Sequence, residues 1–220
     1  MPEHPQTALG RGRIAALVLA AGRSARFEGG HKLLAETGGA PLIAGVMAAI
    51  SQSDAASIIL VTAPDGEPIV AACGPGRWRN VINEAAHEGL ASSIRAGLRA
   101  LETTSRSGPG VAAYAGVLIV LADMPGVTAE LVNALIALSR AHDYNAIVFP
   151  AGSDDRQGHP VLWPHALFPE LMKLSGDQGA KALLQTHRER VVTLPVTDAA
   201  AFLDIDTPQD LARYRARKAQ

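Results

Sequence analysis

Two acidic motifs in the chain could hold a divalent cation against a triphosphate. Asp123 stands in the run LADMP, directly after a strongly apolar segment, and Asp206 stands in the run DIDTP. Carboxylates are the side chains that bind magnesium when the cation also holds phosphate oxygens. Thr207 and Pro208 already supply a cap and a first helical residue, so local structure does not require Asp206. We therefore predict a magnesium site on Asp123 and Asp206, with a plain turn as the competing interpretation of Asp123.

A basic loop after the first apolar segment could hold the phosphates. Its arginines and Lys32 can donate charge-assisted hydrogen bonds to phosphate oxygens, and Gly22 lets the backbone approach a phosphate closely. The loop is neither a P-loop nor a dinucleotide-binding loop, because G-x-x-x-x-G-K-[ST] and G-x-G-x-x-G are absent from the chain. A solvated basic turn is the competing interpretation. The predicted nucleotide-binding residues of this loop are Leu19, Ala20, Ala21, Gly22, Arg23, Ser24, Arg26 and Lys32, and the predicted catalytic residues are Arg26, Lys32 and Asp123.

Three further segments could contact the base or the acceptor. Asn83, Ser92 and Ser93 follow a strand end beside the nucleotide loop, where a small pocket would suit a pyrimidine. The run RQGHPVLW fixes a histidine between glycine and proline, and SGDQGAK opens a helix whose N-terminus could receive an anion. A structural histidine and a plain N-cap are the competing interpretations. The predicted acceptor-binding residues are Gly158, His159, Pro160, Gly176, Asp177 and Gly179.

The elements that must position these residues alternate between strand and helix. Continuous apolar runs at 14–20, 57–62 and 116–121 are typical of parallel strands buried on both faces. Further strands are predicted at 78–83, 146–150 and 191–194, and helices at 41–50, 89–101, 128–139, 165–174, 177–187 and from Pro208, with a loop at 63–76. This alternation predicts an α/β fold, a single Rossmann-like three-layer domain with a mostly parallel sheet. We expect a flexible N-terminal arm at 1–12 and the domain at 13–220.

Composition excludes several classes of function. The chain has 220 residues, 48% of them hydrophobic, and a formal net charge of -1, which predicts a globular protein without an electrostatic case for nucleic acid or membrane partners. Aromatic residues make up only 4%, which argues against base-stacking surfaces. A single cysteine, Cys73, excludes an internal disulfide and a cysteine-rich metal site. No apolar run is long enough for a transmembrane helix, so we expect a cytoplasmic protein.

Taken in order, the runs LAAGRSARF, KLL, LADMP, RQGHPVLW, GDQGAKALL and DIDTPQDL resemble the molybdenum cofactor cytidylyltransferase family, which is related to the molybdenum cofactor guanylyltransferases. The resemblance implies a nucleotidyltransferase-type fold, an NTP held by the loop 19–32, and magnesium on Asp123. It also implies transfer of CMP from CTP to the molybdopterin–molybdenum cofactor with release of pyrophosphate, and a molybdenum hydroxylase as client. Ala21 favours cytosine, because the related guanylyltransferases tend to carry glycine there.

The chain departs from the family pattern at two places, and other functions compete with the transfer of CMP. The segment 28–31, EGGH, fills the loop before Lys32 unusually, and Lys181 stands where the family often has arginine. The same enzyme class could use GTP, or a sugar or alditol phosphate as acceptor. Proteins resembling this family are also described as NAD(P)H-dependent reductases, and a non-catalytic cofactor chaperone is a third possibility. The absence of a dinucleotide fingerprint counts against the reductase.

Overall fold

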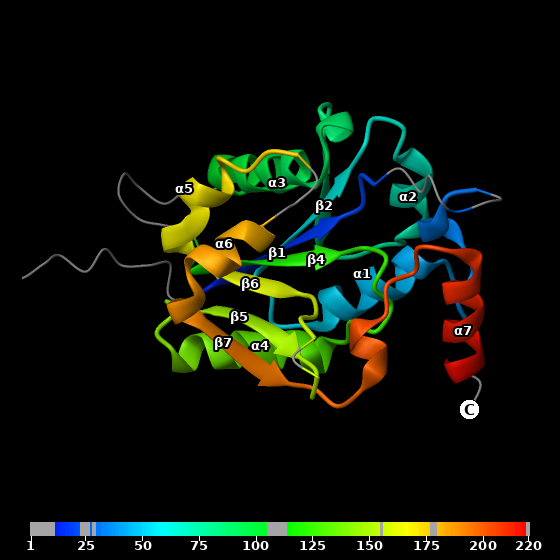
Figure 1. The fold of residues 1–220 in the computed structure, drawn as a ribbon. Helices are drawn as coiled ribbons and strands as arrows, with labels where there is room; N and C mark the ends of the chain where they lie inside the picture. The colour runs from blue at the N-terminus through cyan, green and yellow to red at the C-terminus, as the bar shows by residue number, and fades with distance from the viewer. Residues whose placement is uncertain are drawn as a thin grey trace, which may run out of the picture.

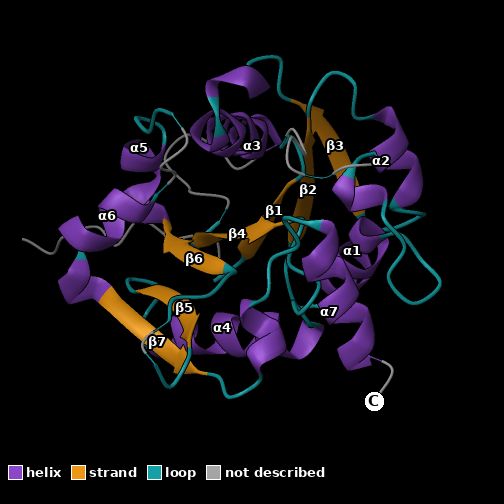
Figure 2. Ribbon diagram, turned by 45° about the vertical axis from the view of Figure 1, so that its right-hand side comes forward, coloured by secondary structure: helices purple, strands orange, loops and turns teal. Residues whose placement is uncertain are grey.

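Seven strands within the described part of the chain form one sheet. A computed structural model describes residues 12–22, 27, 30–104, 114–154, 156–176 and 180–218. The strand order is β3-β2-β1-β4-β6-β5-β7 (Figure 2). Every neighbouring pair is parallel except the two pairs that β6 makes with β4 and β5. The strands are β1 (Ile14–Leu19), β2 (Ser57–Thr62), β3 (Trp78–Ile82), β4 (Gly116–Leu121), β5 (Ile147–Ala151), β6 (Val161–Pro164) and β7 (Val191–Pro195).

The central strands are buried on both faces, which explains their continuous apolar sequences. Successive side chains of a strand point to opposite faces. In β1, Ala16 and Val18 pack into one hydrophobic layer while Ala15 and Leu17 pack into the other. All six residues of β1 are buried. A parallel sheet with such strands needs helices on both faces.

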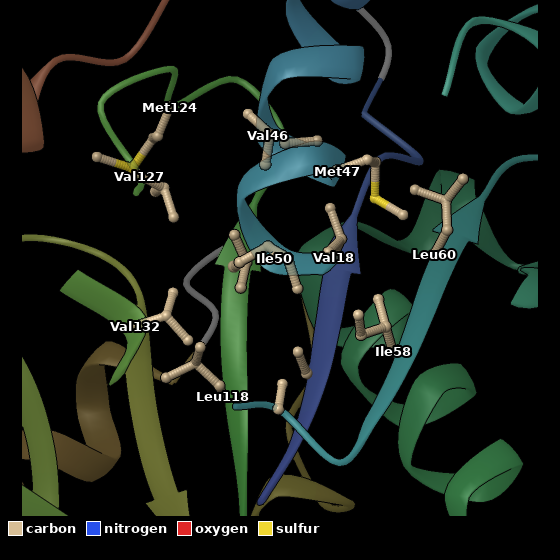
Figure 3. Packing of buried hydrophobic residues seen from close by; sticks show 14 of the residues in the cluster. Val18, Val46, Met47, Ile50, Ile58, Leu60, Leu118, Met124, Val127 and Val132 are labelled. Carbon is tan, nitrogen blue, oxygen red and sulfur yellow. The ribbon is translucent and has the colours of Figure 1, made fainter. Parts of the chain in front are cut away.

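Helices cover the two faces in separate layers (Figure 1). One layer contains α1 (Leu42–Gln52), α2 (Glu67–Ala72), α4 (Ala129–Ala141) and α7 (Pro208–Lys218). Figure 3 shows Val46, Met47 and Ile50 of α1 on the same side of the sheet as Val18 and Leu118, with which they form one hydrophobic cluster. The other layer contains α3 (Leu90–Thr104), α5 (Phe168–Leu171) and α6 (Lys181–Thr186). Short 3-10 turns connect them: η1 (Lys32–Leu34), η2 (Ala86–Glu88), η3 (His165–Leu167), η4 (Arg188–Arg190) and η5 (Ala199–Phe202).

The predicted fold class is confirmed: one α/β domain with a mostly parallel sheet between two helical layers. Two local predictions were wrong, and one strand was not predicted. The segment 63–76 is not all loop, because it contains α2. The run from Val161 forms β6, a four-residue strand that no predicted element included. The helix predicted at 165–174 is divided into η3 and the one-turn α5.

Two other predictions touch residues outside the described ranges. The N-terminal arm predicted at 1–12 lies outside them, apart from Gly12, and so does the start of the helix predicted at 177–187, which is described as α6 from Lys181. In the part of the chain that is described, no helix is both long and apolar enough to cross a membrane.

Candidate active site

Asp123 stands at the carboxyl edge of the sheet, just past the end of β4. The backbone N–H of Ala122 donates to the carbonyl of Leu19 at 3.2 Å, which ties the end of β4 to the end of β1. The helix that follows is capped by Thr128, whose hydroxyl accepts from the N–H of Leu131 at 3.2 Å. The carboxylate of Asp123 therefore has no part in capping α4, and the plain-turn interpretation does not account for it.

The C-terminal segment brings Asp206 to the same edge. The N–H of Ile205 donates to the Asp123 carbonyl at 3.0 Å, and Ile205 itself is fully buried. At the start of α7, Thr207 and Asp210 cap each other: the Thr207 N–H and hydroxyl donate to Asp210 Oδ2 at 2.9 and 2.7 Å. As the sequence predicted, the cap is complete without Asp206.

Lys32 joins the two carboxylates. Its Nζ donates to Asp123 Oδ2 at 2.6 Å and to Asp206 Oδ1 at 2.8 Å, and its side chain is only 13% exposed. Burial alone would lower the pKa of Lys32, but the two carboxylates outweigh burial and raise it. The ammonium is thus held in its charged form between two negative groups, which lie 91 and 174 residues after it in the sequence.

His31 fixes the position of Lys32, and sequence reasoning did not assign it a role. Its Nδ1 accepts from the N–H of Leu33 at 3.3 Å and caps η1. The ring also bonds to the backbone of Gly22, so it links the beginning of the loop to its end. Because Nδ1 accepts, the neutral ring carries its proton on Nε2. Burial lowers the pKa of His31, which favours this neutral form. In the sequence, only the departure of the segment 28–31, EGGH, from the family pattern could have drawn attention to His31.

The predicted nucleotide loop is described only in part. Leu19, Ala20 and Ala21 are buried at the end of β1, and a Cβ built on Gly22 would meet no atom of the described residues within 4 Å. The open space beside Gly22 leaves its backbone accessible to a ligand. The remaining predicted residues of this loop, Arg23, Ser24 and Arg26, lie outside the described residues.

The residues predicted to face the base form one buried polar network. Asn83 Nδ2 donates to the hydroxyls of Ser92 at 2.8 Å and Ser93 at 3.1 Å. Asn83 follows β3, whose ladder continues through a bond from its N–H to Thr62. Asn83 Oδ1 accepts from the N–H of Ala85 at 3.1 Å. The network therefore fixes the turn after β3 against the first turn of α3.

The predicted acceptor segment 158–160 lies beside the carboxylates because β6 is antiparallel. Ile119 of β4 pairs with Val161, so the amino end of β6 meets the carboxyl end of β4. His159 lies close enough to Asp123 and Asp204 for their negative charges to act on its ring, although burial has the larger effect and lowers its pKa. Within the described residues, the buried His159 Nδ1 has no hydrogen-bond partner. The His159–Pro160 peptide bond is cis.

Phe202 and Arg156, to which the sequence analysis gave no role, lie on the side of the site that contains Gly158. The ring of Phe202 lies so close to Gly158 that a Cβ there would come within 2.9 Å of it. The Arg156 guanidinium lies over the same ring, 4.8 Å from its centroid. Partial burial, followed by the charges of Asp206 and Asp123, raises the pKa of Asp204. Phe202 shows no sequence signal, because an isolated aromatic residue is usually a core residue.

The second predicted acceptor segment, of which Gly176 is described, does not lie beside His159. The carbonyl of Gly176 accepts from the N–H of Ala91 at 3.2 Å, at the start of α3. Gly176 therefore lies beside Ser92 and Ser93, whereas His159 lies at the end of β4. The other two predicted residues, Asp177 and Gly179, lie outside the described residues.

The donor set at the carboxyl edge fits a divalent cation. Within the described residues, Asp123 Oδ1 is buried and has no hydrogen-bond partner, so one carboxylate lone-pair direction is available. No three His, Cys, Asp or Glu side chains in the described ranges gather as an all-protein metal site. Two carboxylates are nevertheless the usual protein share for magnesium, whose other ligands are substrate oxygens and water.

A family model identifies the chain. The model of the MobA-like NTP transferase domain matches residues 16–191. The chain belongs to this family. A molybdenum cofactor guanylyltransferase of Rhizobium leguminosarum is 31% identical over 215 residues, which cover 93% of this chain and 92% of that protein.

This MobA-like transferase is also similar to a second protein sequence and to solved structures. The purine catabolism protein PucB of Bacillus subtilis is 29% identical over 63% of this chain, and the matched stretch spans only 62% of PucB. Rv0371c of Mycobacterium tuberculosis is 27% identical with a TM-score of 0.76, covering 93% of this chain and 98% of that one. A complex of Rv0371C with manganese matches with a TM-score of 0.72 at 24% identity, covering 95% and 99%.

Proposed function

We propose that this nucleotidyltransferase transfers CMP from CTP to the molybdopterin–molybdenum cofactor and releases pyrophosphate, with magnesium held by Asp123 and Asp206. The observation that carries the proposal is the convergence of these two carboxylates and Lys32 at the carboxyl ends of β1 and β4. This edge is where open α/β sheets bind their ligands. Membership of the MobA-like family supports the transfer of a nucleotide.

Each group has a part that its position supports. Magnesium at the two carboxylates would neutralise charge on the phosphate oxygens. Lys32 and the open backbone at Gly22 would hold the triphosphate, while the Asn83 network would shape the pocket for the base. His159, beside the carboxylates, would orient the acceptor. Because the acceptor already carries a phosphate, the reaction needs positioning and charge neutralisation more than a deprotonating base.

The choice of CTP rests on Ala21. Its side chain is buried at the end of β1, and its methyl group would narrow the space beside the loop at a position where the guanylyltransferase pattern has glycine. A second candidate is the transfer of GMP from GTP, favoured by the 31% identity with the Rhizobium guanylyltransferase. One methylene more or less on a substrate already changes its selection in a fitted pocket by roughly 10–200-fold, and cytosine and guanine differ by far more, so the two candidates are separable by measurement.

The test is a product assay. The protein is incubated with magnesium, purified molybdopterin–molybdenum cofactor and each nucleoside triphosphate in turn, and the products are identified by mass. We expect a cytosine dinucleotide and pyrophosphate, with CTP used at least about tenfold faster than GTP. Preference for GTP would establish the second candidate. Absence of pyrophosphate with every nucleotide, for this acceptor and for sugar or alditol phosphates, would refute the assignment.

A further inference from the structure

The Lys32 ammonium occupies the point at which the two acidic side chains converge. Its two contacts, 2.6 Å to Asp123 and 2.8 Å to Asp206, are the short distances of charge-assisted hydrogen bonds. The lysine side chain is more deeply buried than either carboxylate, with 13% of its area exposed against 21% and 27%. A cation therefore already lies between the groups that are proposed to bind magnesium.

Two carboxylates that share a site repel each other unless a positive charge lies between them. An ammonium and a divalent cation can both supply that charge, but they repel each other and seek the same oxygens. The N–H of Ile205 and the reciprocal cap of Thr207 and Asp210 hold the backbone of both acidic segments in place. The backbone thus keeps the two carboxylates near each other, and a second cation would have to compete with the ammonium for their oxygens.

We infer that Lys32 is an internal counter-ion that competes with the divalent cation for Asp123 and Asp206. The metal site then opens only when Lys32 is offered another anion, and under the proposed function this anion is the triphosphate. Only the identity of this anion rests on the proposed function. Its consequence is an order of binding: the cation binds weakly to the free protein and enters with the nucleotide.

The geometry supplies a reason for such an arrangement. Lys32 begins η1, which His31 links to the backbone of Gly22, so the ammonium and the open side of the nucleotide loop belong to one structural unit. Asp123 Oδ1 has no partner within the described residues while Oδ2 holds the lysine. Loss of the lysine contact would leave both Asp123 oxygens available to a metal.

The experiment measures Mn²⁺ binding to the protein without nucleotide, by loss of the free-ion electron paramagnetic resonance signal. The variants are Lys32→Met, which removes the charge, and Lys32→Gln, which removes the charge but keeps a hydrogen-bond donor. Lys173→Met is the matched control, because Lys173 is an exposed lysine that follows α5. The double variant Lys32→Met/Asp123→Asn tests whether any gained site uses the expected carboxylate. Thermal melting identifies any variant that does not fold.

We expect Lys32→Met and Lys32→Gln to bind one Mn²⁺ at least about tenfold more tightly than the wild type, because a repelling charge has left the site. Lys173→Met should bind like the wild type, and the double variant should lose the gain. If the folded Lys32 variants bind Mn²⁺ no more tightly than the wild type, the inference is overturned. If Lys32→Met does not fold, the Mn²⁺ affinity of Lys32→Gln decides the question.

A second measurement separates this inference from the proposed function. Water proton relaxation reports Mn²⁺ in a ternary complex, and it is recorded for the wild type with methylene analogues of CTP and GTP. Enhancement with one analogue supports both conclusions. If neither analogue forms the complex while the Lys32 variants still gain Mn²⁺, the nucleotide assignment fails and the counter-ion role stands.

Discussion

Lys32, Asp123 and Asp206 depend on one another for charge balance. Each carboxylate is mostly buried and makes its short contact with the same ammonium. Removing one partner of a partly buried ion pair leaves the other charge poorly compensated. Substitutions at these positions must therefore be judged by activity and by stability together.

Asp123→Asn removes one negative charge and keeps the size of the side chain. Lys32 retains its contact with Asp206, so we expect the melting temperature to change little. Turnover should fall at least about a hundredfold, the scale of losing one preorganised charge-stabilising group. The measurement is turnover against magnesium concentration, with Asp154→Asn, a surface carboxylate 61% exposed, as control. Normal turnover in Asp123→Asn, or wild-type activity in EDTA, would contradict the metal site.

His159→Ala should affect the acceptor and spare the nucleotide. Its ring lies at the amino end of β6 beside Asp123, while the Asn83 network lies beyond β1 and β2 in the sheet. We expect a higher KM for the acceptor or a lower kcat, with the KM for CTP unchanged. Steady-state kinetics with each substrate varied in turn provides the measurement. His142→Ala removes an exposed histidine after α4 and serves as control. A rise confined to the KM for CTP would reverse the assignment of the two half-sites.

At the scale of elements, the segment around η5 positions the acidic residues. It packs on the turn after β4 so closely that a Cβ on Gly126 would overlap the backbone carbonyl of Ala200. The same segment carries Phe202 against Gly158 and leads into Asp204 and Asp206. One short connection thus positions both the acidic residues proposed to bind the metal and the segment proposed to bind the acceptor.

Gly126→Ala should push this connection away from β4. Overpacking of this kind costs about 1–3 kcal/mol of stability, and we expect turnover to fall with it. The matched control is Gly45→Ala in α1, where a Cβ meets no described atom within 4 Å and glycine is a poor helix former. Gly45→Ala should raise stability by about 0.5–1 kcal/mol and leave turnover unchanged. The two variants are compared by urea unfolding and by turnover. If Gly126→Ala leaves turnover as unchanged as Gly45→Ala does, the segment around η5 does not position the site.

The long apolar strands and the residues at their ends were predictable from sequence, because burial on both faces and strand-end placement follow from general rules. The approach of Asp206 to Asp123 was predicted from charge and capping logic, and the described residues bring the two together on Lys32. The position of Lys32 between the two carboxylates was not predicted. Its contacts are with residues 91 and 174 positions later in the chain, and no local pattern indicates them.

Short elements escaped prediction for a different reason. The strand β6 has only four residues, the last of them Pro164, which are too few to show the period of a strand. Its antiparallel direction has no signal in the sequence, yet this direction places His159 beside Asp123. The assignment of Gly176 to the acceptor rests on SGDQGAK as a turn that opens a helix whose N-terminus could receive an anion, and it stays a prediction. The contact of Gly176 with α3 is tertiary, and no local pattern indicates it.

At the scale of the whole molecule, burial lowers the pKa of three histidines, His31, His159 and His165. The folded chain therefore keeps them neutral at pH values where the unfolded chain takes up protons. The stability that depends on the neutral rings is fully present above about pH 6.5, the ordinary pKa, and is lost as the pH falls below it. We expect the free energy of unfolding to fall from about pH 6.5 downward.

His165→Gln should reduce this pH dependence without touching the site. His165 lies in η3 against Phe168, and its Nδ1 has no hydrogen-bond partner within the described residues. Urea unfolding between pH 7.5 and 5 should give a shallower decline for His165→Gln than for the wild type. His142→Gln, at an exposed position, should follow the wild type. An unchanged slope in His165→Gln would show that this ring titrates in the folded state as it does in the unfolded state.

The bond from Ile205 to Asp123 has a consequence for protein synthesis. Ribosomes make the chain from its N-terminus, and domains fold as units once their contacts are available. The sheet is complete at Pro195, but Asp206, which lies 174 residues after its lysine partner, is translated later. A nascent chain that has just finished its last strand therefore exposes Lys32 and Asp123 without their third member. Until the segment after η5 docks, Asp206 cannot reach the Lys32 ammonium, and the emerging protein lacks one of the two carboxylates proposed to bind the metal.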